Sequence, residues 1–440
     1  MVWFSPVCFL FLYSLGDVCG ASEEWDLLEK LLNGYDTAVR PVSEVSDVLN
    51  FTMDVSLNQV IDVDERNQII KLNIWMRWYW VDSYLKWNSS EYGGIKDVYI
   101  QPKRIWIPDV TLYNSVSTTD HGWPSHYNAK IHYDGSVTYL FPAYLEASCK
   151  IDVTHFPFDT QSCVLTFGSW AYSGAQLDMY PYAPLGNWEN FVENGEWELL
   201  SIPSRRNVKY YPCCPEPFPD VKFTIVLKRL PLYHVYNLLM PCILITCINL
   251  FTFLLPVESG EKISLNVTVL LTMVVFLLIV AEIMPPQSEV IPIIGMYFGV
   301  CIVLLSLGTL ASVFVIHLHF RGSRGRLVPS WLKCIFRWLG FITCYRETLA
   351  VANFRPDSKS GDCHTVKPQT YEFKDPGMKA GKGEMNGHYV PEVEIQAPGD
   401  KREATAEKEW VTVALILDRV FFFLFLISTG TITGYVLSYL

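Results

Sequence analysis

Four long apolar runs occupy much of the second half of the chain, and each is long enough to cross a lipid bilayer. A helix needs about 20 predominantly apolar residues to span the hydrocarbon core. The runs cover Leu232 to Leu255, Ile263 to Met284, Ile291 to Phe320 and Trp410 to Leu440. The pattern therefore predicts transmembrane helices one to three within residues 231–320 and a fourth in residues 410–440.

The first half of the chain has a different period. Between Val48 and Leu230, apolar and polar residues alternate in short segments such as "IIKLNIWMRWYWV" and "VKFTIVLKRL", separated by Gly, Pro and Asp. Alternation with a period of two is typical of half-buried antiparallel strands. Ser22 followed by "EEWDLLEKLL" predicts a capped helix before them. The fold class expected for residues 21–230 is an immunoglobulin-like β-sandwich of about ten strands with an N-terminal helix, joined to a four-helix transmembrane domain.

Targeting and charge signals predict the orientation of the spans. Residues 1–20 form a short apolar segment that ends in small residues, as signal peptides do. Its removal would leave residues 21–230 outside the cell, and four spans would return the C-terminus to the same side. Basic residues follow the third run, namely Arg321, Arg324, Arg326, Lys333 and Arg337. Because loops rich in Lys and Arg remain in the cytoplasm, we expect residues 321–409 to be a cytoplasmic loop in a multi-pass plasma-membrane protein.

Most of that loop is rich in Gly, Pro, Lys and Glu and poor in large apolar residues, which predicts flexibility. The exception is "VPSWLKCIFRWLGFI" at its start. There, apolar residues recur at helical spacing between basic ones, at Trp331, Ile335, Trp338 and Leu339. This pattern predicts a helix that lies on the inner membrane face.

Composition and motifs favour no enzymatic or nucleic-acid function. The net charge is −11, and the sequence contains no phosphate-binding glycine loop, no metal-ligand constellation and no nucleophile motif with a base. We therefore expect no catalysis, no metal, no cofactor and no nucleic acid partner. Asn50 and Asn88 begin glycosylation sequons in the predicted extracellular domain. A third sequon, at Asn266, lies in a predicted span and should remain unmodified.

Four of the 12 cysteines lie in the predicted extracellular domain: Cys149, Cys163, Cys213 and Cys214. Four cysteines allow three connectivities, so spacing alone leaves their pairing open. Cys149 and Cys163 enclose the thirteen residues "KIDVTHFPFDTQS". The adjacent pair lies between two prolines, where a vicinal disulfide would stiffen the tip of a hairpin.

The thirteen-residue loop with "FPFD" (Phe156 to Asp159), the vicinal cysteines and the four spans resemble those of Cys-loop ligand-gated ion channels. The resemblance is to nicotinic acetylcholine receptor α-type subunits in particular, and it extends from about Trp25 to Leu440. Other matching motifs are "DVDERNQ", "WIPDVTLYN", "FGSWAYSG" and "SGEKISLNVTVLLTMVVFLLIVAEIMP". The resemblance implies disulfide-bonded cysteines, a pentamer and a cation-selective pore, with a location such as the postsynaptic membrane.

The resemblance also implies a site for a small, acetylcholine-like cation between neighbouring subunits. Aromatic faces attract such cations. The principal face would include Tyr113, Trp170, Tyr172, Tyr211, Cys213, Cys214 and Phe218, and the neighbouring subunit would add Trp75, Thr138 and Leu140. Trp78, Trp80 and Trp106 are assigned to the core instead. Because one chain carries both faces, a homopentamer is the expected assembly, and a heteropentamer also fits the sequence.

Two residues depart from the family pattern. Phe218 occupies the position of a second hairpin tyrosine, so one hydroxyl is missing. Glu146 occupies the position of a lysine that, in the family, is thought to exchange partners between a tyrosine and an aspartate, here Tyr211 and Asp220. A carboxylate facing Asp220 would repel it. These departures motivate an alternative function, a binding or accessory subunit that does not open normally with acetylcholine.

The second span carries a predicted pore face. Residues spaced alternately by three and four lie on one side of a helix, and this face runs through Glu261, Ser264, Thr268, Leu271, Val275, Leu278 and Glu282. Five copies would form a pore lined by acidic rings, a hydroxyl-lined section and an apolar constriction. Monovalent cations are expected to pass through it, and divalent cations also fit the pattern. An ordinary packed helix whose hydroxyls bond its own backbone is the alternative. The "GEK" motif resembles the cation-selective branch of the family.

Coupling between the domains is expected at their junction. The resemblance implies that Glu65 and Arg229 form a buried pair. It also places Phe156, Pro157 and Phe158 on the segment from Pro285 to Pro292. Unpaired surface charges are the alternative for the first two residues. Asp418 and Arg419, adjacent in the fourth span, are expected to pair with each other.

Overall fold

The computed structural model describes residues 22–117, 123–287, 290–322, 327–343 and 398–439, with side chains from residue 404 in the last segment. The predicted signal peptide and residues 344–397 of the predicted cytoplasmic loop lie outside this range. The chain divides into two compact units, which are described separately. The first contains all residues up to Met240 together with Leu277–Met296 and Ser438–Leu440. The second contains Pro241–Phe276 and Tyr297–Leu437.

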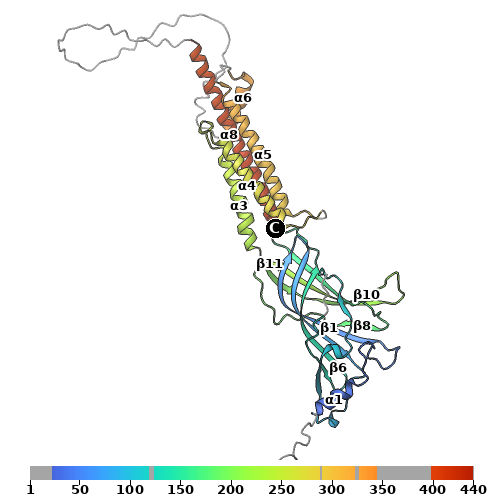
Figure 1. Ribbon diagram of the computed structural model, residues 1–440. Coiled ribbons are helices and arrows are strands. Elements are labelled where there is room, and N and C mark those ends of the chain that lie inside the picture. The colour runs from blue at the N-terminus through green and yellow to red at the C-terminus, as the bar shows by residue number, and fades with distance from the viewer. Residues whose placement is uncertain (1–21, 118–122, 288–289, 323–326, 344–397, 440) are drawn as a thin grey trace, which may run out of the picture. The chain divides into compact units, whose positions relative to one another are not determined.

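The first unit contains two β-sheets (Figure 1). The six-stranded sheet has the order β3-β5-β6-β2-β1-β8, and all its neighbours are antiparallel except the parallel pair β1 and β8. Its strands are β1 (Leu49–Asp64), β2 (Ile69–Val81), β3 (Asp97–Ile100), β5 (Ala129–His132), β6 (Ser136–Ser148) and β8 (Leu177–Pro181). The five-stranded sheet has the order β10-β11-β7-β4, and β9 also pairs with β11. Its strands are β4 (Val110–Leu112), β7 (Thr160–Ser169), β9 (Trp197–Ser201), β10 (Ser204–Lys209) and β11 (Phe218–Arg229).

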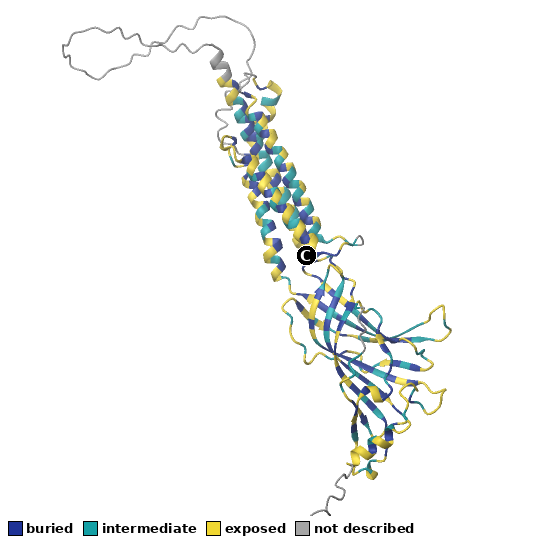
Figure 2. Ribbon diagram, in the orientation of Figure 1, coloured by how far each residue is buried: buried dark blue, intermediate teal, exposed yellow. Residues whose placement is uncertain are grey.

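These eleven strands agree with the predicted sandwich of about ten, and alternation along the strands explains how they pack. In β2, alternate side chains from Ile70 to Trp80 are buried, and Figure 2 shows the same alternation along the other strands. Trp78 lies at the centre of an aromatic core, with its ring 5.6 Å from Phe51 and 5.1 Å from Phe141. Trp80 and Trp106 are each 3% exposed, so the three tryptophans assigned to the core are in it.

The N-terminal helix α1 (Glu23–Leu32) forms where the sequence predicted it. Ser22 caps it by accepting a hydrogen bond from the Trp25 amide at 3.3 Å, and Leu27 and Leu31 are the buried residues of its inner face. Three short helical turns lie in or after the sandwich, η1 (Ser89–Glu91), η2 (Pro102–Arg104) and α2 (Leu232–His234).

Among the residues that the structure describes, four helices are long and apolar enough to cross a membrane: Leu232–Phe251, Lys262–Ile283, Ile293–His319 and Ala404–Tyr439. The first is α2 followed by a π-helical turn, η3 (Val235–Leu239), and α3 (Met240–Phe251). The π turn ends just before Pro241, whose missing N–H and bulky ring oppose a regular α-helical turn there. The others are α4 (Lys262–Ile283), α5 (Ile293–His319) and α8 (Pro398–Tyr439), and the turn η4 (Val257–Ser259) precedes α4.

Helix α8 begins at Pro398 and not at Trp410, so the last part of the predicted cytoplasmic loop is helical. "EATAEKE" consists largely of good helix formers, which extend the apolar helix toward its N-terminus. Ala406 is fully buried, and Glu409 accepts hydrogen bonds from the Val328 amide and from Lys333. These contacts fix the added turns against α6 (Ser330–Ile342) and the segment that precedes it.

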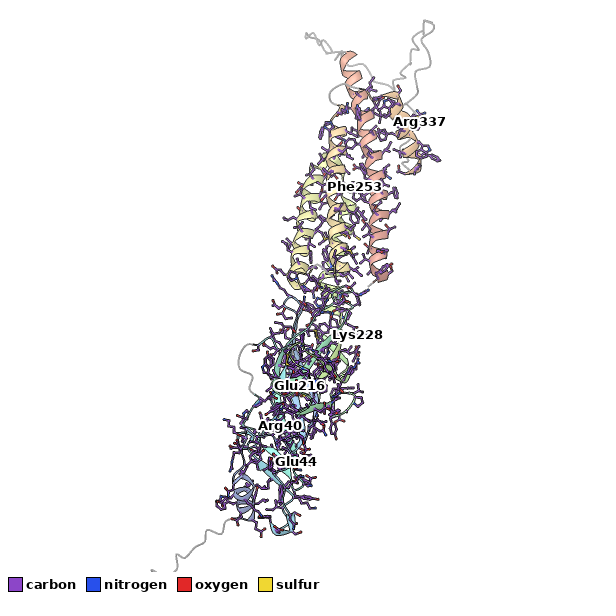
Figure 3. The ribbon with its side chains drawn as sticks, turned by 90° about the vertical axis from the view of Figure 1, so that its right-hand side faces the viewer. Arg40, Glu44, Glu216, Lys228, Phe253 and Arg337 are labelled. Atoms are coloured by element: carbon purple, nitrogen blue, oxygen red, sulfur yellow. A yellow bond between two sulfur atoms is a disulfide. The ribbon has the colours of Figure 1, made fainter. Side chains whose placement is uncertain are left out.

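Inside the second unit, α3, α4, α5 and α8 run side by side (Figure 1). Phe253, labelled in Figure 3, follows α3 and packs on Phe421 and Phe425 of α8 with ring centroids 6.1 and 5.1 Å away. Asp418 forms a buried ion pair with Lys262 of α4 and not the expected pair with Arg419. Consecutive residues on a helix point in different directions, so Asp418 faces α4.

Helix α6 is amphipathic, but the four apolar residues expected on one face are divided between two faces. Leu332 and Leu339 pack with Phe336 against Trp410 and neighbouring α8 residues. Trp331, Ile335 and Trp338 form the exposed apolar face. Leu339 belongs to the packed face because one residue beyond Trp338 turns the side chain by about 100°.

Candidate functional site

The aromatic residues of the predicted principal face lie at the ends of strands in the five-stranded sheet. Tyr113 follows β4, Trp170 follows β7, and Tyr211 lies in the hairpin between β10 and β11. The rings of Tyr113 and Trp170 meet edge to face with centroids 6.3 Å apart. Tyr211 meets Phe218 in the same way at 5.5 Å. Trp170 is 76% exposed, and so large an exposed ring is a surface that favours a partner or ligand.

A short hydrogen-bond network holds Trp170 in place, and it depends on Asp109, which sequence reasoning did not select. The Asp109 carboxylate accepts hydrogen bonds from the Ser169 hydroxyl and, at 2.7 Å, from the Ala171 amide. The Ser169 hydroxyl in turn accepts from the Tyr172 amide at 2.9 Å. Asp109 lies within the motif "WIPDVTLYN". The tendency of Asp side chains to accept hydrogen bonds from backbone amides in turns is the sequence signal that points to it. Tyr172 itself packs on Trp106, with centroids 6.2 Å apart.

Tyr113 is fixed from two sides. Its hydroxyl donates a 2.6 Å hydrogen bond to the Ser169 carbonyl, and its ring lies over Gly168, where any β-carbon would come within 2.3 Å of the phenol oxygen. Burial, with the nearby charges of Tyr211 and Asp220, raises the pKa of Tyr113 to about 12. The phenol therefore stays protonated at neutral pH.

The hairpin contains the predicted vicinal disulfide between Cys213 and Cys214. The Cys214 amide donates to the Tyr211 carbonyl at 3.1 Å, and the Gly174 amide donates to the Pro217 carbonyl at 2.7 Å. The second contact attaches the returning side of the hairpin to the turn after Trp170. The other disulfide joins Cys149 to Cys163.

Asp220, at the base of the hairpin, is 1% exposed and has its partners on β10. Its Oδ2 accepts a 2.9 Å hydrogen bond from Asn207 Nδ2 and lies 3.7 Å from Lys209 Nζ. Its Oδ1 has no hydrogen-bond partner among the described residues. Glu146 instead accepts a 2.7 Å hydrogen bond from the Tyr144 hydroxyl. Asp220 and Glu146 thus have different partners, Asn207 and Lys209 for the first and Tyr144 for the second.

The predicted complementary residues lie on the other sheet. Trp75 and Leu140 line an open pocket of about 500 Å³ on β2 and β6, together with Met76, Arg77, Tyr79, Phe141 and Pro142. Thr138, opposite Tyr79 in the β2–β6 register, is beside the pocket and not among its lining residues. Arg77 is the unexpected member, and Asp54 Oδ2 lies 3.4 Å from its guanidinium. The predicted principal residues therefore lie at the five-stranded sheet, and the predicted complementary residues lie on the six-stranded sheet.

Near the last residue of β11, Arg229 is the centre of an ion cluster. Its guanidinium is buried and lies 2.7 Å from Glu65, 2.8 Å from Asp159 and 3.0 Å from Glu196. Its flat faces lie over Trp197, 4.1 Å from the ring centroid, and over Phe156 at 4.9 Å. The resemblance implied only the Glu65 partner. Asp159 is the last letter of "FPFD", while Glu196 has no comparable signal in the sequence.

The three carboxylates are not equivalent. Burial raises the pKa of Glu65, although Arg229 acts against this shift. Interaction with the neighbouring His234, and then with the positive charge of Arg229, lowers the pKa of Glu196. His234 Nε2 is 3.6 Å from the Glu196 carboxylate, and its ring meets Phe156 with centroids 4.8 Å apart.

The three residues of the Cys149–Cys163 loop that were expected at the junction have different surroundings. Phe156 is fully buried against Arg229 and His234, Pro157 is buried and Phe158 is 40% exposed. The contact with the segment around Pro292 comes from Thr154, whose carbonyl accepts a 3.1 Å hydrogen bond from the Ile293 amide. Phe156 faces inward because the guanidinium above it offers a cation–π contact.

All seven predicted pore-face residues of α4 and its N-terminus, from Glu261 to Glu282, are exposed in the single chain. The opposite face is buried and includes Lys262, Asn266, Val269 and Met273. Asn266 Nδ2 donates a 2.8 Å hydrogen bond to Ser312 Oγ of α5, which accounts for a polar residue on that face. Thr268 donates to the Ser264 carbonyl at 2.8 Å, so its hydroxyl is satisfied within the helix.

Both sequons of the predicted extracellular domain are accessible. Asn50 in β1 and Asn88 are exposed. Asn88 caps η1, where its Oδ1 accepts from the Ser90 amide at 3.2 Å. Asn266, by contrast, is 1% exposed.

The sequence matches two family profiles. Residues 24–231 match the neurotransmitter-gated ion-channel ligand binding domain, and residues 238–348 match the neurotransmitter-gated ion-channel transmembrane region. The chain belongs to the neurotransmitter-gated ion-channel family. Its members are ligand-gated ion channels and not enzymes, are typically pentameric, and cross the membrane several times.

Individual relatives place the similarity among the nicotinic subunits. The neuronal acetylcholine receptor subunit alpha-9 of Gallus gallus is 43% identical over 309 residues, which are 70% of this chain and 63% of that protein. The alpha-10 subunit of Homo sapiens is 36% identical over 417 residues, 91% of this chain and 89% of that protein. The human alpha-3 subunit is 40% identical over 328 residues, 74% and 65% of the two chains.

The chain thus spans less than two thirds of the alpha-9 and alpha-3 relatives but most of alpha-10. These similarities confirm the predicted resemblance to Cys-loop receptors of the nicotinic α type.

Proposed function

We propose that this family member is a subunit of a pentameric cation channel of the plasma membrane, opened by a small organic cation that binds between subunits. The observation that carries the proposal is the exposed face of α4, where Glu261 and Glu282 flank hydroxyl and apolar residues. Carboxylates along a span are costly against lipid and acceptable against water. A central aqueous pore satisfies this requirement when five copies surround it.

The ligand site is proposed to combine the principal face of one subunit with the complementary pocket of the next. Tyr113, Trp170 and Tyr211 supply aromatic faces for an ammonium group. Trp75 and Leu140 supply an apolar wall in a pocket of about 500 Å³, large enough for a small ligand. Because the two groups occur on different sheets of one chain, a homopentamer would carry a complete site at every interface. A heteropentamer with related subunits would carry it at some of them.

The hairpin between β10 and β11 is proposed to close over the ligand. The Cys213–Cys214 disulfide restricts its tip, and Lys209 and Asp220 hold its base. Tyr211 moves with the tip, and such pre-organisation lowers the entropy lost on binding. Phe218 offers a ring but no hydroxyl, which favours contact with an apolar part of the ligand.

Ligand binding is proposed to reach the pore through the Arg229 cluster and the loop closed by Cys149 and Cys163. Arg229 joins β11, which begins at the hairpin, to Glu65 and Asp159. Thr154 of the same loop contacts Ile293, the first residue of α5, the helix that follows α4 in the chain. The proposed orientation puts both termini outside the cell and residues 321–409 largely inside, with a synaptic location compatible with it.

Expression of the chain alone, with currents recorded during application of a panel of amines, tests the proposal. We expect cation currents that are abolished by Trp170→Ala. The matched control Trp188→Ala, which alters another exposed tryptophan, should retain them. Cysteines substituted at Thr268 or Leu271 should react with aqueous thiol reagents, and a cysteine at buried Val269 should not. If no position on the exposed face reacts in any state, α4 does not line water and the channel assignment fails.

A second candidate is an accessory subunit that needs a partner to open, favoured by the residues Glu146 and Phe218 that depart from the family pattern. It predicts no current from the chain alone but surface expression and binding of a radiolabelled amine. Co-expression with a related subunit would then restore a current with altered conductance. Glu146→Lys and Phe218→Tyr, alone and together, separate the two candidates by whether they restore a current to the chain expressed alone.

A further inference from the structure

A pocket of about 390 Å³ lies in the first unit, where the loop between β8 and β9 meets the end of β11. Its lining residues include Phe191, Trp197 and Leu230, together with the carboxylates of Glu193 and Glu198. No lysine, arginine or histidine is among the described residues that line it. The pocket shares no lining residue with the complementary pocket on β2 and β6, so it is a separate site.

Hydrogen bonds to β1 hold the loop that forms this pocket. The Val192 amide donates to the Asn58 carbonyl at 2.8 Å, and Asn194 Nδ2 donates to the Val60 carbonyl at 2.9 Å. Asn194 Oδ1 accepts a hydrogen bond from the Trp197 amide at 3.2 Å. The aromatic and acidic side chains therefore extend from a fixed loop, and the pocket is largely formed before a ligand enters it.

The pocket lies where the chain enters the first predicted span. The Leu230 amide donates to the Glu196 carbonyl at 2.8 Å, and the span begins at Leu232. Tyr233 and Tyr236, near the start of that span, are 71% and 62% exposed. Exposed tyrosines at the end of a span are typical of the headgroup layer of a bilayer. The pocket is therefore within reach of lipid headgroups.

The side chains in and beside the pocket match the two charges of a choline phospholipid headgroup. Aromatic faces attract quaternary ammonium groups, and Phe191 supplies a half-buried ring beside the carboxylate of Glu193. Lys228 is exposed on β11, where Figure 3 labels it, and lies opposite Glu198 in the β9–β11 register. Residues directly opposed in antiparallel strands have β-carbons about 5 Å apart. Lys228 thus places a cation beside the acidic pocket, where it suits a phosphate.

We propose that this pocket binds the headgroup of a choline phospholipid of the outer leaflet. The trimethylammonium group contacts Phe191 and Glu193, and the phosphate lies beside Lys228. The choice of leaflet rests on the proposed function and its membrane orientation, whereas the binding itself does not. Trp197 lines the pocket and packs on Arg229, whose guanidinium is 4.1 Å from the ring centroid. An occupied pocket would therefore hold Trp197 in place against the ion cluster.

The test is saturation-transfer-difference NMR on the purified full-length chain in a maltoside detergent, which contains no choline. Dioctanoyl phosphatidylcholine is the probe, and its trimethylammonium signal reports binding. Wild type should give a saturable signal. Phe191→Ala and Glu193→Gln should each weaken binding about fivefold or more. Dioctanoyl phosphatidylglycerol should compete poorly, because it carries no ammonium and the carboxylates of the pocket repel its net negative charge.

Free choline separates a lipid headgroup from a soluble ammonium ion as the source of the same chemistry. It should bind about tenfold or more weakly than the phospholipid, because it lacks the phosphate and the acyl chains. Lys228→Gln should weaken binding of the phospholipid and leave that of choline unchanged. Choline that binds as tightly as the phospholipid would overturn the assignment to a lipid.

Matched controls come from the same loop. Glu189 and Val192 are exposed and do not line the pocket, so Glu189→Gln and Val192→Ala should bind the phospholipid as wild type does. Thermal unfolding of each variant without lipid shows that it is folded. The proposal is overturned if wild type gives no saturable signal, if phosphatidylglycerol competes equally, or if Glu193→Gln and Phe191→Ala bind as wild type does. Because no current is measured, a silent channel leaves the result interpretable, and a failure here leaves the channel proposal standing.

Discussion

The carboxylate of Asp220 lies 3.7 Å from the ammonium of Lys209, on the strand that pairs with its own. Asp220 is buried while Lys209 is 42% exposed at its side chain. The hairpin thus carries its own counter-charge for Asp220. Asp220 therefore has a cationic partner on β10, although Glu146 occupies the position of the family's lysine.

Neutralising Lys209 should weaken the response to agonist. Lys209→Gln removes the cation beside Asp220, and since the pair is partly exposed its loss is expected to cost on the order of 0.5 kcal/mol, a two- to threefold rise in half-maximal agonist concentration. Concentration–response curves measure the shift. Lys222→Gln on β11 is the matched control and should leave the curve in place, and an equal shift in both variants would remove the special role of Lys209.

Acid should weaken the contribution of Glu196 to stability. The folded-state pKa of Glu196 is lowered by His234 and Arg229, so its stabilising effect is complete above the ordinary carboxyl pKa and is lost as pH falls through the lowered value. The gap in unfolding temperature between wild type and Glu196→Gln should therefore be widest near neutral pH and narrow below about pH 4.5. Glu198→Gln, an exposed neighbour, should show no such trend, and a gap that widens in acid contradicts the assignment.

Glu261 should concentrate cations at the inner mouth of the pore. It is exposed at the start of α4, where five copies would form a ring of negative charge. Glu261→Gln is expected to lower single-channel cation conductance without a change in agonist sensitivity. Glu258→Gln, an exposed glutamate in η4 off the pore face, serves as control, and equal conductance in wild type and Glu261→Gln would argue against the predicted ring.

The buried pair of Lys262 and Asp418 should show strong coupling. Removing one partner leaves an uncompensated charge inside the bundle, at a cost of about 3–5 kcal/mol, while replacing both with apolar residues is often tolerated. Lys262→Met and Asp418→Leu are each expected to reduce surface expression severely, and the double variant should recover most of it. Surface labelling of intact cells measures this, and additive losses in the double variant would show that the two residues act independently.

The strands, the helices and their buried faces could be predicted well from the sequence. The ion pairs and hydrogen bonds between distant residues could not. Alternation in β2 and the long apolar runs fix buried faces, because burial of apolar surface dominates the free energy of folding. The fourth helix still began twelve residues before the expected Trp410, at Pro398. That start depends on packing of residues such as Ala406 against other segments, which no local pattern reports.

Polar contacts between distant segments were harder to foresee for a similar reason. Glu65 could be matched to Arg229 through a motif, yet Glu196 joins the same guanidinium from a loop with no motif. Asp418 was expected to pair with its neighbour Arg419, but the direction of its side chain is set by the helix and selects Lys262. Lys209 was overlooked because its importance appears only once β10 and β11 are paired.

Tyr113, Trp170 and Tyr211 lie on one sheet and Trp75 on the other. If they form the proposed site, one chain carries both sides of every interface between subunits. In a homopentamer, a substitution on either the principal or the complementary face of the chain would damage the site at every interface. Co-expression of one variant altered on the principal face and one altered on the complementary face would therefore restore some intact sites. The recovered agonist sensitivity would depend on how often an intact principal face meets an intact complementary face.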